Sequence, residues 1–156
     1  MTNDFLQVQL PIDLIAQKRP GECLAACALM VLRHLQVPAD YGQLVRILGI
    51  TDIGAPFSRL LRLDVLGVQV TLAGGTLARL HQHLANGLPC IVSVDTRELP
   101  YWRGVASPHA VVVCGMDARD VHLLDPGFVT GPFLATHGDF DLAWLECDEE
   151  YAIVTR

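Results

Sequence analysis

The stretch that decides the fold is residues 17–30, QKRPGECLAACALM, where a polar loop turns into an apolar helix. Residues 22–34 favour helix, and their alanines and leucines form an apolar surface on nearly every side. A helix of that kind is expected at the centre of a domain. Cys23 is placed where the loop becomes the helix. Free backbone N–H groups and the positive end of the helix dipole favour the nucleophilic thiolate form of a thiol at this place.

Length and composition narrow the class of protein. The chain has 156 residues, of which 51% are hydrophobic and 18% charged, and its formal net charge is −6. We expect one domain over residues 1–156, because single domains cluster at roughly 100–200 residues. The high hydrophobicity and low charge density exclude a disordered chain. The acidic balance argues against a nucleic-acid partner, which usually requires a basic patch.

The hydrophobicity does not indicate a membrane protein. The longest uncharged apolar run covers residues 23–32, about half of the roughly 20 residues that a bilayer-spanning helix needs, so no stable membrane insertion is expected. Residues 1–10 lack a basic segment followed by an apolar block, so no secretory signal is expected. The five cysteines are odd in number and widely spread, unlike a disulfide framework. These observations predict a cytoplasmic chain with reduced thiols.

The remaining elements are predicted to be helices first and then mostly strands. Apolar and polar residues alternate over residues 5–10, which predicts a short extended segment. Further helices are expected at residues 39–48, 57–66, 76–86 and 139–145. Strands are expected at residues 68–72, 89–94, 109–114, 121–124 and 151–155. This order predicts an α+β fold, with an N-terminal helical layer packed on a mostly antiparallel sheet.

A thiolate used for acyl transfer needs a base within hydrogen-bond reach and a third group that orients the base. His109 begins a predicted strand, and Asp125 ends the next one. If the two strands form an antiparallel hairpin around a turn at residues 115–120, His109 and Asp125 are neighbours. The alternative interpretation is a structural histidine and a turn-forming aspartate. Tyr101 and Trp102 precede His109 in an irregular stretch, where they either line a substrate groove or cap the core.

Four residues form a pattern in a fixed order along the chain: Gln17, Cys23, His109 and Asp125. With the Ala-Ala-Cys that closely follows Cys23 and the β-branched strand after His109, this pattern resembles the papain-like bacteriocin-processing cysteine peptidases, which remove double-glycine leader peptides. The resemblance implies a papain-like fold, Cys23 as nucleophile, His109 as general base and acid, and Asp125 as the group that orients the imidazole. It also implies that Gln17 donates to the oxyanion together with the backbone N–H of Cys23. One such donor is worth about 3–4 kcal/mol in the transition state.

Three positions depart from that family pattern. Glu22 and Leu24 flank Cys23 where the family usually has aspartate and glycine, and Ala110 follows His109 where an aromatic residue is common. Leu24 fills a place where the missing side chain leaves room beside the thiol, so this departure concerns the fit of the substrate. The family peptidase is usually fused to a transporter. Because this sequence contains no transporter segment, we expect it to act alone or to meet a transporter or biosynthetic partner in trans.

The expected function is a cysteine peptidase that cleaves a peptide or protein substrate through a thioester acyl-enzyme, with leader-peptide removal after small residues as one form of that reaction. No cofactor and no metal are expected. An acyl or peptidyl transferase remains open, because an amine or a thiol other than water can resolve the same thioester. A catalytically silent peptide-binding domain of this fold is the third hypothesis. A degenerate domain would be expected to lose Cys23 or His109, and this chain keeps both.

Other cysteines and histidines have simpler interpretations. Cys27 lies one helical turn after Cys23 and is predicted to be a packed core thiol, because no nearby Cys or His completes a zinc site. His81 and His83 are two residues apart on a predicted helix and therefore point away from each other. They are expected on a solvated polar face and not on a shared metal.

Overall fold

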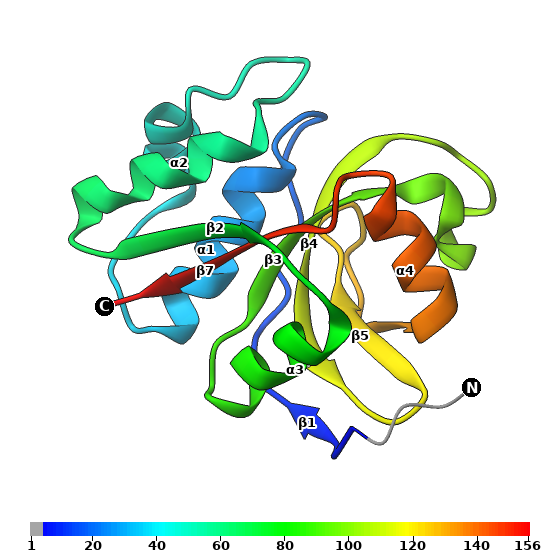
Figure 1. Ribbon diagram of the computed structural model, residues 1–156. Helices are drawn as coiled ribbons and strands as arrows, with labels where there is room; N and C mark the ends of the chain where they lie inside the picture. Colours follow the sequence, from blue (N-terminus) through cyan, green and yellow to red (C-terminus); the bar gives the residue numbers. More distant parts are fainter. Residues whose placement is uncertain (1–4) are drawn as a thin grey trace.

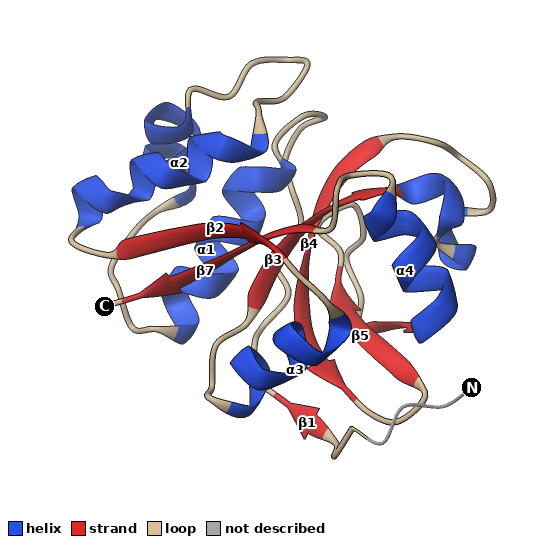
Figure 2. Ribbon diagram, in the orientation of Figure 1, coloured by secondary structure: helices blue, strands red, loops and turns tan. Residues whose placement is uncertain are grey.

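The computed structural model describes residues 5–156; residues 1–4, part of the segment tested for a secretory signal, lie outside the described residues. A seven-stranded sheet runs through the structure with helices on both faces (Figures 1 and 2). The strands lie in the order β2-β7-β3-β4-β5-β6, and β1 pairs with β4. Every pair is antiparallel, which confirms the predicted α+β class. Within residues 5–156, no helix is long and apolar enough to cross a membrane.

The elements agree closely with the predicted ranges. The helices are α1 (Cys23–His34), α2 (Tyr41–Leu48), α3 (Leu77–Ala85), α4 (His137–Leu145) and the 3-10 helices η1 (Phe57–Leu66), η2 (Thr96–Glu98) and η3 (Pro100–Trp102). The strands are β1 (Val8–Gln9), β2 (Gln69–Gly74), β3 (Cys90–Asp95), β4 (Pro108–Met116), β5 (Asp120–Leu124), β6 (Phe133–Thr136) and β7 (Glu150–Thr155). The helix predicted at 57–66 is a 3-10 helix, which fits its buried leucines, Leu60 and Leu63, spaced three residues apart. Strand β6 was not predicted.

The central position predicted for α1 is confirmed. Residues 24–32 are each at most 3% exposed, and the helix packs against β4 (Figure 1). Side chains alternate along β4, so that Ala110 and Val112 join the core under α1, whereas Val111 and Val113 join the core under α3 and α4. The helical layer predicted on one face is therefore matched by a second layer, α3 and α4, on the other. A sheet buried on both faces explains why β3 and β4 are nearly continuous apolar runs.

The loop that precedes α1 is held by side-chain and backbone contacts. Glu22 does not cap α1 with its side chain; its carboxylate accepts a hydrogen bond of 2.7 Å from the hydroxyl of Tyr41 in α2. Gly21 has a φ of +84°, which favours glycine, and a Cβ there would lie 2.8–3.0 Å from backbone atoms of residues 51–54. The first turn of α1 thus lacks a side-chain cap. Cys23 stands at this uncapped end, next to the loop of residues 51–54.

Candidate active site

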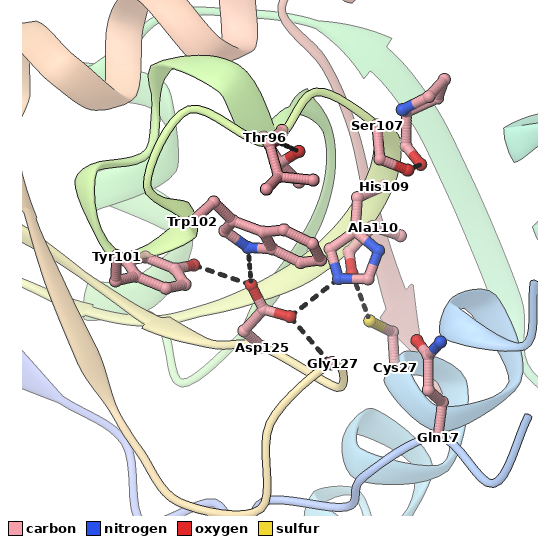
Figure 3. Close-up of polar contacts among 12 residues, drawn as sticks. Gln17, Cys27, Thr96, Tyr101, Trp102, Ser107, His109, Ala110, Asp125 and Gly127 are labelled. Carbon is pink, nitrogen blue, oxygen red and sulfur yellow. Dashed lines mark hydrogen bonds and ion pairs between the residues drawn. The ribbon is translucent and has the colours of Figure 1, made fainter. Parts of the chain in front are cut away.

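Strands β4 and β5 pair as an antiparallel hairpin, as the sequence predicted, and bring His109 and Asp125 together. The Nε2 atom of His109 lies 2.7 Å from Oδ1 of Asp125 (Figure 3). The pair is buried, since His109 is 8% exposed and Asp125 is 0% exposed. The aspartate binds the histidine ring directly, as expected for neighbours, and it also forms a turn, because its Oδ1 atom accepts from the backbone N–H of Gly127.

Asp125 is surrounded by hydrogen-bond donors (Figure 3). Its Oδ2 atom accepts hydrogen bonds of 2.8 Å from the Tyr101 hydroxyl and from Nε1 of Trp102, and its Oδ1 atom accepts one of 2.8 Å from the backbone N–H of Gly127. The Trp102 ring also contacts the His109 ring edge to face, with centroids 5.1 Å apart. Tyr101 and Trp102 thus hold the carboxylate, a role that neither the groove nor the core interpretation named.

These contacts set the charges of the pair. Burial raises the pKa of Asp125, but hydrogen bonding to His109, the charge of His109 and the bonds from Trp102 and Gly127 outweigh burial and hold the pKa below its ordinary value. Burial lowers the pKa of His109, but the hydrogen bonds and charges of Asp125 and Cys23 outweigh it and raise the pKa to about 9. At neutral pH the pair is therefore a buried imidazolium and carboxylate.

Cys23 and His109 line the same cavity, which has a volume of about 280 Å³. Cys23 is half-buried at the first position of α1, and its side chain is near enough to raise the pKa of His109 through a hydrogen bond. Cys27 is 0% exposed and its Sγ donates to the carbonyl of Ala110 at 3.5 Å (Figure 3), which confirms the predicted core thiol. Burial raises the pKa of Cys27 well above its ordinary value. Of these two cysteines, only Cys23 lines the cavity.

Gln17 lies in the loop beside Asp125, but its side-chain N–H₂ group donates elsewhere. Its backbone N–H donates to the carbonyl of Pro126 at 2.8 Å, which fixes the loop beside Asp125. Its Nε2 atom donates to the carbonyl of Arg19 at 3.3 Å, and its Oε1 atom is buried with no hydrogen-bond partner (Figure 3). The predicted oxyanion role therefore requires the amide to turn, so that the N–H₂ group takes the place of the unpartnered oxygen.

The other predicted histidines belong to the packing of α3. The ring of His81 lies 2.8 Å from the carbonyl of Leu6, and the ring of His83 lies 3.0 Å from the hydroxyl of Tyr151. Both are half-buried and so only partly solvated, because a helical pattern shows which side chains diverge but not what covers them. Among the described residues, no group of three or more His, Cys, Asp or Glu is placed to hold a metal ion.

Removing one donor from Asp125 is expected to destabilise the fold. Tyr101→Phe should lower the free energy of unfolding by about 1.5–3 kcal/mol, because it deletes a hydrogen bond to a buried charged group. The matched control is Tyr151→Phe, whose hydroxyl bonds the His83 ring; burial lowers the pKa of that ring, so it is neutral at pH 7 and the expected loss is about 1 kcal/mol. Urea unfolding at neutral pH measures both. Equal losses would contradict the charge-assisted bond.

The fold recurs in solved structures of peptidases. A C39-like peptidase from Bacillus anthracis superposes with a TM-score of 0.80 at 16% identity, covering 96% of this chain and 98% of that chain. A double glycine motif protease from an AMS/PCAT transporter, solved in complex with the leader peptide, gives 0.75 at 18% identity, covering 95% and 94%. The peptidase domain of Streptococcus ComA, a bi-functional ABC transporter, gives 0.73 at 16% identity, covering 91% and 96%. These likenesses confirm the predicted papain-like peptidase fold.

Sequence comparison shows the family to which the chain belongs. Among curated proteins, none matches the chain. The family model described as Butirosin biosynthesis protein H, N-terminal, matches residues 32–126, more than half of the chain. The matched range includes His109 and Asp125 and begins after Gln17 and Cys23. The chain therefore belongs to the family described as Butirosin biosynthesis protein H, N-terminal, and has the fold of the C39-like, double-glycine leader peptidases.

Proposed function

We propose that this protein is a papain-like cysteine peptidase with Cys23 as nucleophile, His109 as general acid and base, and Asp125 as the positioning residue. The observation that carries the proposal is the buried pair of His109 and Asp125, 2.7 Å apart, next to a cavity that Cys23 also lines. The charge of His109, the position of Cys23 at the start of α1 and its place in the cavity wall all favour Cys23 as the nucleophile. The fold of solved peptidases supports this assignment.

The reaction follows from the charges at this site. The imidazolium of His109 stabilises the thiolate of Cys23, which attacks the carbonyl carbon of a peptide bond. The oxyanion that forms is held by the backbone N–H of Cys23 and by the turned amide of Gln17. His109 then gives its proton to the leaving nitrogen, the C–N bond breaks, and a thioester remains. His109 takes a proton from water, the hydroxide attacks the thioester, and the acid product leaves as the thiolate is restored.

The substrate that we propose is a peptide cleaved after a small residue. Leu24 is 3% exposed and lines the cavity directly beside Cys23, which narrows the space at the thiol. Leader-peptide removal fits this restriction, and a protease of the same fold has been solved with a leader peptide. We further propose that the chain works as one domain, in the cytoplasm, with a transporter or biosynthetic enzyme in trans. All five cysteines are unpaired, as a reducing compartment requires.

Alkylation tests the nucleophile. Iodoacetamide is expected to modify Cys23 at least about tenfold faster than Cys147, the other half-buried cysteine, because only Cys23 lies beside an imidazolium. Peptide mass spectrometry after timed exposure near neutral pH measures each rate. His109→Ala should bring the rate of Cys23 close to that of Cys147. Protection of Cys23, or equal rates at the two cysteines, would contradict the proposed nucleophile.

Product analysis tests the reaction class. A peptide thioester should acylate Cys23, and the acyl-enzyme is then offered water and a primary amine together. We expect the free acid as the main product, which liquid chromatography with mass spectrometry quantifies. An amide of the added amine as the main product would instead identify a transferase and overturn the peptidase assignment.

A further inference from the structure

We propose that Tyr41 of α2 is a positioning residue for the oxyanion hole, because its hydroxyl holds both ends of the loop that joins Gln17 to Cys23. This inference rests on the proposed function and adds a residue to the same site. Both proposed oxyanion donors flank residues 18–22. Residues 11–22 form neither helix nor strand, so the position of the donors depends on a few individual contacts.

A single hydroxyl makes the two contacts. The backbone N–H of Lys18 donates to the Tyr41 hydroxyl oxygen at 2.9 Å, and the same hydroxyl donates to the carboxylate of Glu22 at 2.7 Å. We call these three groups the Tyr41 clamp. Gln17 directly precedes the first contact and Cys23 directly follows the second. A movement at either contact therefore passes to an oxyanion donor through one peptide unit.

The clamp is buried although the loop that it holds is not. Tyr41 is 8% exposed and Glu22 is 9% exposed, whereas residues 18–20 lie in solvent. Burial raises the pKa of Tyr41, the N–H of Lys18 opposes this, and the hydrogen bond and charge of Glu22 add to it, so that the pKa reaches about 12. At neutral pH the hydroxyl therefore keeps the proton that it donates to the buried carboxylate, which needs such a partner.

Tyr41 is a firm support for this loop. It is the first residue of α2, whose start is fixed by a capping box of Asp40 and Gln43, and α2 packs against α1 (Figure 1). At the entry of the loop, the backbone N–H of Gln17 donates to the carbonyl of Pro126 at 2.8 Å. The loop is thus fixed both to α2 and to the segment that follows the catalytic pair.

The chemical effect of the clamp should be confined to steps that form an oxyanion. Deleting one oxyanion donor costs about 10²–10³ in kcat, and displaced donors should cost less, about 10–100-fold. Alkylation by iodoacetamide forms no oxyanion, because the thiolate of Cys23 displaces iodide from a CH₂ group. A loss of the clamp should therefore slow acylation of Cys23 and leave its alkylation unchanged.

Tyr41→Phe tests this difference. Phenylalanine keeps the ring and its contact with the Lys18 ammonium, 4.9 Å from the ring centroid, and removes only the hydroxyl. A peptide thioester that ends in glycine acylates Cys23, and intact-mass spectrometry of quenched samples follows the reaction. The maximal acylation rate should fall about 10–100-fold, whereas the half-saturating concentration and the iodoacetamide rate should change less than about twofold. The control Tyr151→Phe removes another buried tyrosine hydroxyl, one that bonds His83 outside the cavity, and should keep all three values.

A second pair of variants tests the other end of the clamp. Glu22→Ala removes the acceptor of the Tyr41 hydroxyl and should slow acylation in the same way. Glu22→Gln still offers an oxygen to that hydroxyl and should recover most of the loss. A Glu22→Gln variant as slow as Glu22→Ala would show that the charge of the carboxylate matters and not its hydrogen bond, and would overturn the clamp.

The outcomes separate this inference from the proposed function. Rapid alkylation of Cys23 with an unchanged acylation rate in Tyr41→Phe would overturn the clamp and leave the nucleophile intact. Alkylation that falls in parallel with acylation would also overturn it, because the hydroxyl would then support the fold in general. If Cys23 of the natural protein reacts with neither reagent faster than Cys147, the proposed function fails and the clamp fails with it.

Discussion

Cys23→Ala is expected to abolish peptide cleavage, with a fall in kcat/KM of roughly 10⁴-fold or more, because the thioester cannot form. Cys27 cannot take over, since it is fully buried and its thiol is bonded to the carbonyl of Ala110. The measurement is hydrolysis of a fluorogenic peptide with glycine on the carbonyl side of the cleaved bond. Intact-mass spectrometry should show an acyl-enzyme on the natural protein and none on the variant.

The matched control is Cys147→Ala. Cys147 is also a free, half-buried cysteine, but it does not line the cavity of Cys23. We expect its variant to keep the activity of the natural protein, and we expect similar urea unfolding midpoints for both variants. Cleavage that survives in Cys23→Ala, or that is lost equally in Cys147→Ala, would contradict Cys23 as the nucleophile.

The sequence predicts the fold well wherever burial leaves a strong pattern. A helix that is apolar on nearly every side must be covered on every side, and α1 indeed lies under β4 with residues 24–32 buried. Strand β6 escaped prediction because its four residues are too few to establish a period, and it pairs with β5 alone at the end of the strand order. The covering of the second sheet face by α3 and α4 depends on the chain path, which the element order does not specify.

The candidate site, like the fold, can be predicted from the sequence only in part. Cys23, His109 and Asp125 each stand at the end of a regular element, so helix and hairpin geometry place them before any contact is known. Tyr101 and Trp102 lie in or beside the short 3-10 turns, where no periodicity indicates a direction, and only the folded path of the chain carries them to Asp125. The direction of an amide such as that of Gln17 depends on the local carbonyls, which spacing along the sequence does not show.

Asp125→Asn is expected to lower kcat/KM by about 10²–10⁴-fold, because the imidazole loses the group that orients it and stabilises its charge. The pH dependence should change as well. Burial lowers the pKa of His109 from the ordinary value of 6.5, but hydrogen bonds and charges from Asp125 and Cys23 together raise it to about 9. In the variant only Cys23 opposes burial, so the pKa of His109 should fall below about 9. The imidazolium that stabilises the thiolate would then be lost at a lower pH than in the natural protein.

The rate of iodoacetamide alkylation at Cys23, followed from about pH 5 to about pH 10, measures this shift independently of turnover. The natural protein should lose its rate enhancement as the pH rises through about 9, and Asp125→Asn should lose it as the pH rises through a lower value. Asp117→Asn is the matched control, because Asp117 also bonds a histidine, His122 at 2.9 Å, but away from the cavity. Its profile should follow that of the natural protein. If the alkylation rate of Asp125→Asn still loses its enhancement near pH 9, Cys23 alone holds the proton on His109. Asp125 then serves only to orient the ring.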